Sequence, residues 1–395
     1  MTTIPPDPAE AARLPRNVRV LGGASLLNDI ASEMIYPLLP AFLLNVLGGS
    51  KFHLGIIEGA VESLSSLLKL WFGGRSDRAG RRKGYILTGY TLAAISRPLV
   101  AFITAPWHLF AVRVADKFGK GIRTAPRDAL LADSTPLALH GRAFGFHRAM
   151  DHLGAAIGPV LATLFLLVWP GELRTLFFLA LIPGLCVLVL LFVGLKEAPA
   201  VATTREPVRL SLQPFDRNFR WYLLALLLFT LGNSSDLFLL VRAGELGVPL
   251  AYLPLLWFAF HLLKSLGNLW CGRLTDRFGP RRLILLGWLL YAGVYLAFAV
   301  ATSAWEAWTF FLLYAVFYAL TEPAEKALVT RLAGKEKKGL AFGWYHCIIG
   351  LAALPASVGF GWLYQTWGPL AAFGSGAGLA LVAMLVFLRV RLEEK

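Results

Sequence analysis

Two short basic segments with the same pattern, GGRSDRAGRRKG (73–84) and CGRLTDRFGPRRLI (271–284), each interrupt a long apolar stretch of the chain. Their aspartates, Asp77 and Asp276, are 199 residues apart. Two further pairs of similar segments repeat at separations of 197 and 198 residues, centred on Pro126 and Pro323 and on Gly145 and Gly343. Three pairs in one register predict a duplicated chain, with two halves related by an axis normal to a membrane.

The composition is that of a membrane protein. Of the 395 residues, 57% are hydrophobic and only 16% are charged, whereas a soluble domain carries about a quarter charged residues. Apolar runs of bilayer-spanning length recur along the chain. The net charge of +14 is better explained by membrane topology than by nucleic acid, since Lys and Arg gather on one side of a membrane. We therefore expect an all-α polytopic protein in the lipid bilayer, with no nucleic-acid partner.

Twelve membrane-spanning helices are predicted, in two pseudo-symmetric bundles of six. They are expected near 18–46, 54–73, 84–105, 107–131, 141–168, 174–195, 219–243, 251–272, 282–303, 305–331, 340–364 and 368–389. A polar interval rich in Pro, Thr and charge separates the bundles and is typical of a linker. The predicted organisation is an N-terminal segment (1–17), a first bundle (18–195), a linker (196–218) and a second bundle (219–395).

The charges of the loops predict the orientation. Alternate loops are rich in Arg and Lys, such as 75–83 and 273–282, whereas the opposite loops carry almost none. This asymmetry places both termini and the linker in the cytoplasm, with the chain in the cell (inner) membrane. The polar, Pro-rich N-terminus predicts no cleavable signal peptide.

Ionisable residues within the spans predict a wet interior, because a charge at the bilayer centre is costly unless it faces protein or water. The sixth, ninth and twelfth spans carry essentially none. The candidates to line a cavity or contact a substrate are Arg113, Asp116, Lys117, Lys120, Arg123, Arg148, Asp151, Asp236, Glu322, Glu325 and Lys326. Those on the fourth span share one helical face. They could hold an anionic or zwitterionic solute, or they could be neutralised by acids on neighbouring spans, and the sequence does not decide between the two.

Two pairs of acids are candidate proton carriers. Asp29 and Glu33 on the first span are four residues apart, and so are Glu58 and Glu62 on the second span, which puts each pair on one helical face. Burial disfavours the charged form of a carboxyl group, so such a group can take up and release a proton during a cycle. The alternative is a structural ion pair with the fourth span, above all for Glu58.

The basic segments resemble the loop signature of the major facilitator superfamily. Its pattern between the second and third helices is matched in full by Gly73, Asp77, Arg78, Gly80, Arg81 and Arg82. Asp276 and Arg277 occupy the counterpart in the second half. The resemblance implies a conformational latch, in which the aspartate pairs with basic groups at the cytoplasmic end of a helix from the other half. That pair holds the outward-open state and breaks on switching.

A second motif resembles the fifth-helix signature of antiporters in this superfamily. It comprises Gly145, Gly154, Gly158 and Pro159, although Leu161 and Ala162 stand where further glycines are common. The resemblance implies a secondary transporter that works by alternating access, with proton-coupled efflux of a small organic solute. The alternative within transport is a proton-coupled importer of a small charged nutrient or metal complex.

A membrane-embedded enzyme is the competing class of function. The sequence contains no phosphate-binding glycine loop, no nucleophile elbow and no His or Cys at metal-ligand spacing. We therefore expect no enzymatic activity, no cofactor and no metal site. The expected partners are the bilayer, a small-molecule substrate and protons, and the chain is expected to be a monomer.

Overall fold

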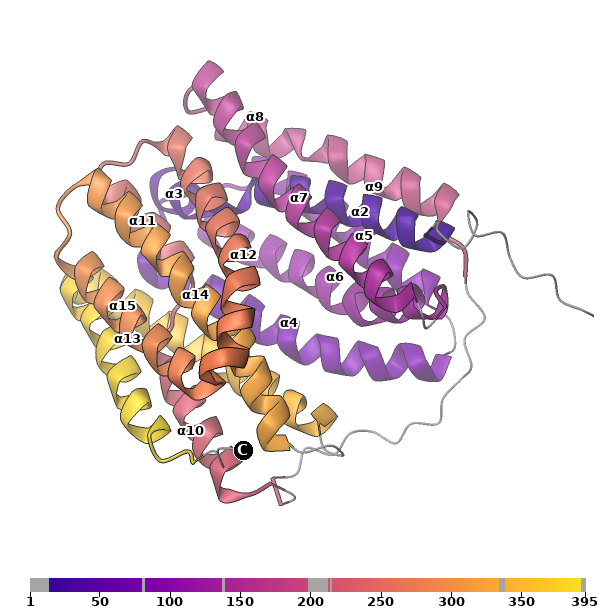
Figure 1. Ribbon diagram of the computed structural model, residues 1–395. Helices are drawn as coiled ribbons and strands as arrows, with labels where there is room; N and C mark the ends of the chain where they lie inside the picture. The colour runs from indigo at the N-terminus through magenta and orange to yellow at the C-terminus, as the bar shows by residue number, and fades with distance from the viewer. Residues whose placement is uncertain are drawn as a thin grey trace, which may run out of the picture.

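A computed structural model describes residues 14–79, 82–136, 139–197, 212–213, 215–333 and 338–391, with the backbone alone for residues 69–79, 141, 269 and 338–339. These residues form α-helices and short 3-10 turns, without a strand among them (Figure 1). The predicted N-terminal segment lies outside the described residues up to residue 13, as does most of the predicted linker.

The first half contains six helical passes. The first pass bends just after Glu33, because Pro37 and Pro40 lack the amide hydrogen that a continuous helix needs. The elements are α2 (Arg16–Glu33), η1 (Tyr36–Leu38), α3 (Leu39–Asn45), α4 (Lys51–Ala79), α5 (Lys83–Leu99), η2 (Val100–Phe102), α6 (Pro106–Asp133), α7 (His140–Val168), α8 (Leu173–Leu179) and α9 (Leu181–Gly194).

The described residues of the second half also form six passes, of which the last two are separated near the predicted boundary, while a break in the seventh pass was not predicted. Residues 233–235 are not helical, so the seventh pass is broken in its middle. A positive φ of 80° at Gly368, followed by Pro369, separates the last two passes within α15. The elements are α10 (Arg217–Gly232), α11 (Leu237–Glu245), η4 (Leu250–Tyr252), α12 (Leu253–Phe278), α13 (Pro280–Val300), α14 (Ala304–Ala333) and α15 (Lys338–Phe387).

These passes confirm the predicted all-α architecture. Seven stretches of the described residues are apolar and long enough to cross a bilayer by composition alone. The four passes that do not qualify are α2–α3, α4, α5 and α6. All four carry the buried acidic and basic residues of the candidate site, which lowers their apolar character.

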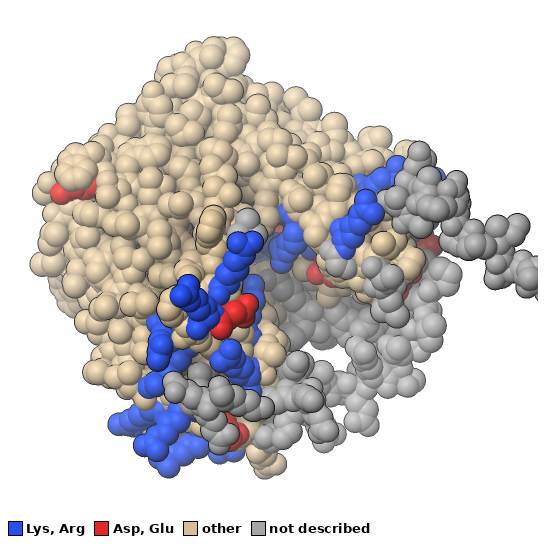
Figure 2. All heavy atoms as spheres, viewed as in Figure 1, with Lys and Arg blue, Asp and Glu red and all other residues tan. Residues whose placement is uncertain are grey.

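Positive charge gathers at one end of the bundle. This end, where α4, α6, α12 and α14 finish, is called the basic end, and the opposite end is called the distal end. Figure 2 shows Lys and Arg side chains concentrated on one part of the surface, while most of the remaining face carries almost no charge. This distribution is the one that membrane topology requires of a polytopic protein.

The two halves are in close contact toward the distal end. Gly59 of α4 lies so near α15 that a Cβ atom would be 2.9 Å from the Leu354 Cα. Lys51 at the start of α4 forms an ion pair of 2.6 Å with Glu245 of α11. Further hydrogen bonds between the two halves join Lys51 to Gln365 at the distal end, and Ser63 to Gly350 and Glu33 to Trp257 toward the middle of the bundle. The distal end is therefore closed.

Candidate functional site

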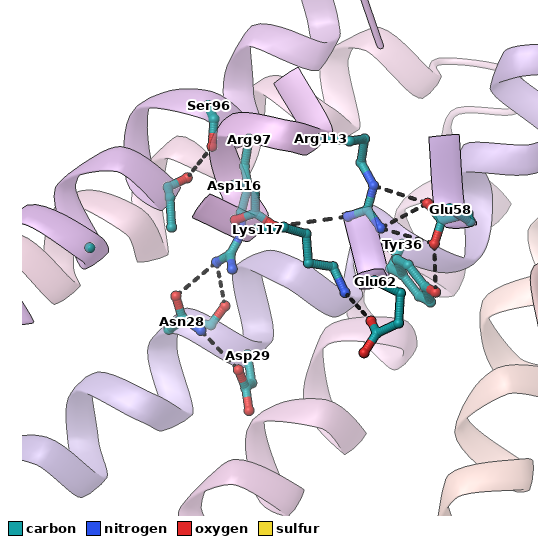
Figure 3. Close-up of polar contacts among 12 residues, drawn as sticks. Asn28, Asp29, Tyr36, Glu58, Glu62, Ser96, Arg97, Arg113, Asp116 and Lys117 are labelled. Atoms are coloured by element: carbon teal, nitrogen blue, oxygen red, sulfur yellow. Dashed lines mark hydrogen bonds and ion pairs between the residues drawn. The ribbon is translucent and has the colours of Figure 1, made fainter. Parts of the chain in front are cut away.

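A bidentate ion pair is the centre of the polar interior of the first half. The Arg113 Nη2 lies 2.9 Å from the Glu58 Oε1, and the Arg113 Nε donates to the same oxygen at 3.1 Å. Tyr36 donates its hydroxyl hydrogen to the other Glu58 oxygen. Figure 3 shows the three side chains pointing toward one another from η1, α4 and α6. Both charged side chains are buried, so each depends on the other for compensation.

A second buried pair extends this network. The Asp116 carboxylate accepts a hydrogen bond of 3.1 Å from the Arg97 Nε and lies 3.8 Å from the Arg113 Nη1. Arg97 also donates to the backbone and side-chain oxygens of Asn28 on α2. The network of Glu58, Arg113, Asp116 and Arg97 contains two acids and two bases (Figure 3). It is therefore balanced in charge.

A small cavity lies beside this network. It has a volume of about 20 Å³ and is lined by Ser32, Tyr36, Arg97, Arg113 and Asp116 together with apolar residues. A volume of this size is enough for one water molecule when several polar groups surround it. The cavity therefore offers a site for one water molecule between α2 and the charged network.

The remaining bases of α6 differ from one another in their partners and in their exposure. The Lys117 Nζ lies 3.3 Å from the Glu62 Oε2, and the side chain of Glu62 is 46% exposed. Lys120 is exposed. Arg123 is buried, donates to the Gly89 carbonyl and stacks over the Tyr90 ring at 4.5 Å. The sequence left open whether these charges hold a solute or are neutralised by neighbouring spans. In the structure, Arg113, Asp116 and Lys117 are each paired with an oppositely charged residue on a neighbouring helix.

The other acid pair, Asp29 and Glu33, has a different environment. Neither carboxylate makes an ion pair with any residue that the structure describes. Asp29 accepts a hydrogen bond of 2.9 Å from the amide of Asn28. Glu33 accepts one of 2.9 Å from the indole nitrogen of Trp257, which belongs to α12 of the second half. The hydrogen bonds to both acids thus come from neutral donors, while the cations Lys120 and Arg97 act on them from a longer range.

The glycines of α7 bring its backbone against this acidic face of α2. A Cβ atom at Gly154 would lie 3.0 Å from the Asp29 Cβ, and one at Gly158 would lie 3.1 Å from the Glu33 Cβ and 2.7 Å from the Ile30 carbonyl oxygen. Gly145 behaves differently, since a Cβ atom there would meet nothing within 4 Å. The close packing expected of this motif is therefore absent at Gly145.

Replacing Gly158 with Ala is expected to destabilise the protein by about 1–3 kcal/mol, because the added methyl group overlaps the backbone of α2. Gly145→Ala is the matched control on the same helix and is expected to leave stability unchanged. Thermal unfolding of the two purified variants in one detergent measures the difference. Equal unfolding temperatures would contradict the packing described here.

In the second half, Asp236 lies next to the break in the seventh pass. Its carboxylate accepts hydrogen bonds from the hydroxyl of Tyr314 at 2.8 Å and from that of Tyr318 at 3.1 Å. Glu325 is buried and accepts from the Tyr345 hydroxyl at 2.7 Å. Tyrosine hydroxyls thus donate to both acids, and neither acid makes an ion pair with a described residue.

The other predicted residues of the second half lie nearer to solvent. Glu322 pairs with Lys264 at 2.8 Å and accepts a hydrogen bond from Asn268. Its side chain is about one-third exposed, as suits a residue at the edge of an aqueous space. Lys326 is exposed.

Asp151 and Arg148 both lie on α7, but they differ in how far they are exposed. Asp151 is largely buried, accepts from the Ser25 hydroxyl and lies 3.5 Å from His147. The Arg148 side chain is 74% exposed, although one nitrogen lies 3.6 Å from Asp151. Arg148 therefore faces solvent rather than the buried network.

The predicted latch falls only partly within the described residues. Gly80 and Arg81 lie outside them, and the side chains of Asp77 and Arg78 and the surroundings of Gly73 are not described. Arg82 pairs with Asp133 at the end of α6, within its own half, at 3.0 Å. Asp276 and Arg277 make no ion pair with a described residue. The latch therefore stays a prediction.

Sequence reasoning assigned no role to Arg97, Asn28 or Trp257, which organise this site. An arginine within an otherwise apolar span was the available signal for Arg97. No comparable signal existed for Trp257, because an apolar ring in a membrane span is equally suited to lipid or to a core.

Comparison with known proteins agrees with this architecture. The model of the Major Facilitator Superfamily matches residues 21–262 and 237–395. The uncharacterised MFS-type transporter MJ1317 of Methanocaldococcus jannaschii is 31% identical over 95% of both chains. The multidrug resistance protein MdtH of Photorhabdus laumondii is 27% identical over 87% of this chain and 85% of its own. The crystal structure of the nucleoside transporter NupG covers 95% of this chain and 99% of its own, with a TM-score of 0.80 and 12% identity. The chain therefore belongs to the major facilitator superfamily of membrane transporters.

Proposed function

We propose that this transporter exports a small organic solute in exchange for protons, and that Asp29 and Glu33 carry the protons. The observation that supports this most directly is their lack of any described ion pair beside a network that is balanced in charge. A carboxylate in the membrane interior whose hydrogen-bond donors are neutral can be protonated without taking a direct ion-pair partner from a buried cation.

The acids on α4 are less suited to carry protons. Protonation of Glu58 would remove the compensation of Arg113, whose side chain is buried. Glu62 is paired with Lys117 and its side chain is close to half exposed. We propose that Glu58 is structural and that Glu62 and Lys117 form part of the wall of the solute pathway, together with Lys264 and Glu322 of the other half.

Two observations support export. Gly154 and Gly158 belong to the antiporter-like motif together with Pro159, and they pack directly against Asp29 and Glu33. The relatives include MdtH, whose name describes a multidrug resistance protein. Because this motif contacts the proposed proton carriers, a change in their charge can alter how α7 packs against α2.

We propose that the basic end is cytoplasmic, in the inner membrane of the cell, with both termini on that side and the transporter functioning as a monomer. The closed distal end then corresponds to an inward-facing state. In the outward-facing state the basic end closes, and Asp77 and Asp276 serve there as the latch that the loop signature implies.

Everted membrane vesicles that contain the protein test the proposed function. An imposed gradient, acidic inside, is expected to drive uptake of at least one compound from a panel of fluorescent cationic, anionic and zwitterionic solutes. A protonophore is expected to stop that uptake. Uptake that ignores the gradient for every compound taken up would contradict proton coupling.

A further inference from the structure

The hydrogen bond from Trp257 to Glu33 connects the two halves at a proposed proton carrier. The Trp257 Nε1 lies 2.9 Å from the Glu33 Oε2, and only 4% of Trp257 is exposed. The donor belongs to α12, near the distal end, and the acceptor is the last residue of α2. Among the described hydrogen bonds and ion pairs between the halves, it alone involves Asp29 or Glu33.

Aromatic contacts fix the indole from both sides. The Tyr36 ring of the first half lies 5.5 Å from the Trp257 ring. In the second half, Phe260 and His261 pack against it at 5.4 and 4.7 Å between ring centroids. An indole nitrogen can only donate a hydrogen bond. Trp257 therefore presents a fixed donor to the carboxyl of Glu33 as long as the distal end is closed.

We infer that Trp257 couples the protonation of Glu33 to the opening of the distal end, an inference that rests on the proposed function. An ionised Glu33 accepts a charge-assisted bond, which is about twice as strong as the bond to a neutral carboxyl. Loss of the charge weakens the contact and favours separation of α12 from α2. Protonated Glu33 thus permits the outward-facing state, whereas ionised Glu33 holds the distal end closed.

This arrangement limits outward opening of the empty carrier. A deprotonated carrier is held closed at the distal end, so from the inward-facing state it does not open outward until a proton or a solute binds. Only a ligand that binds the two states with different affinity can shift their equilibrium. Here the proton is that ligand, and the bond to Trp257 is a contact present in one state only.

Other charged groups around this contact also respond to pH and must be separated from Glu33. Around Glu33 and His261 they are Asp29 on α2, Arg97 on α5, Lys120 on α6, Asp151 and His152 on α7, Lys264 and His261 itself on α12, and Glu322 on α14. Around Tyr36 they are Glu58 and Glu62 on α4, Arg113 on α6 and Asp236 beside α11. His261 is the closest to Trp257, and its Nε2 has no described partner. His261→Phe is therefore included as a variant that removes a titratable neighbour and keeps the ring contact.

Spin labels at the distal end measure the opening directly. Asn45 of the first half and Thr366 of the second are exposed and have no described side-chain bond, so each is replaced by a labelled cysteine. The three native cysteines, Cys186, Cys271 and Cys347, are replaced by Ala. Distance distributions between the labels by double electron–electron resonance, over a pH series, give the fraction of protein that is open at the distal end.

The labelled parent protein is expected to open at the distal end as the pH falls. Trp257→Phe keeps an aromatic ring without the donor, and it is expected to raise the open-to-closed ratio at high pH by about 10- to 100-fold. Its pH dependence should be flattened. Glu33→Gln keeps an acceptor oxygen but loses the charge, so it should act in the same direction. The double variant should add little to Trp257→Phe, because both changes act on one contact. His261→Phe should keep the pH response of the parent.

Trp288→Phe is the matched control for the loss of an indole. Trp288 is also fully buried, stacks on Phe229 and lies beside Glu325 within the second half, so its substitution removes an indole without changing the contact between the halves and should leave the pH response intact. A parental pH response in Trp257→Phe, or additive effects of Trp257→Phe and Glu33→Gln, would overturn the inference.

Failure of this inference can be told apart from failure of the proposed function. If Glu33→Gln loses gradient-driven uptake while the Trp257→Phe distances match those of the parent, proton coupling stands and the role of Trp257 is refuted. If Glu33→Gln retains full gradient-driven uptake, Glu33 is not the carrier, and the link between its protonation and opening is refuted together with it. If Trp257→Phe does not insert, Glu33→Gln tests the same contact from the acceptor side.

Discussion

Glu58→Gln is expected to cost about 3–5 kcal/mol of stability, because it leaves the guanidinium of Arg113 buried beside an uncharged partner. The Arg113 side chain is only 7% exposed, and its second acidic neighbour, Asp116, lies at 3.8 Å and is already bonded to Arg97. Thermal unfolding of the purified variant in detergent, with the fraction of monodisperse protein, measures the loss.

Two comparisons make this expectation specific. Glu62→Gln removes the charge of a side chain that is 46% exposed, and a pair of this kind contributes about 0–1 kcal/mol, so its variant should stay close to the parent. Replacing Glu58 and Arg113 together by Met removes both charges and should recover most of the stability. Equal losses in Glu58→Gln and Glu62→Gln would show that Arg113 does not depend on Glu58.

Asp29→Asn and Glu33→Gln are expected to behave in the opposite way. Each amide keeps the size of the carboxyl group, and neither substitution strands a described cation, so the folded protein should persist. A group that is permanently neutral cannot carry a proton through the cycle. Each variant should therefore lose gradient-driven uptake, while at least one should still exchange solute at equilibrium across the membrane.

The two kinds of transport assay separate coupling from structure. A structural role for these acids predicts loss of expression or folding, with recovery when a basic neighbour such as Lys120 is also neutralised. A coupling role predicts normal expression with loss of the response to the gradient alone. Full gradient-driven uptake in both single variants would exclude the first pass, and Glu58 and Glu62 would be the next acids to test.

The positions of the passes could be predicted closely from hydropathy. The run expected at 107–131 corresponds to α6 (Pro106–Asp133), and the run expected at 282–303 corresponds to α13 (Pro280–Val300). A bilayer requires a nearly constant length of apolar chain, and that length is visible in the sequence. The break at 233–235 and the bend after Glu33 were not predicted, because they change the direction of the chain without changing its hydropathy.

The chemistry of the site could be predicted only in part. Helical periodicity placed Asp29 with Glu33 and Glu58 with Glu62, since that relation is local. It could not show which pair is neutralised, because Arg113 reaches Glu58 from another helix, 55 residues away in sequence. The contact between Glu33 and Trp257 spans 224 residues and depends on how the two halves close, and that information lies in packing rather than in any local pattern.

The direction of proton movement during export tests the central claim most directly. The purified protein is reconstituted into liposomes that enclose a pH-sensitive dye, and a compound identified in the vesicle assay is added outside without any imposed gradient. Exchange predicts that inward movement of the compound drives protons outward, so the interior becomes alkaline, and that Glu33→Gln abolishes this signal. Acidification of the interior on addition of the compound would show that solute and proton move together, and it would contradict the account.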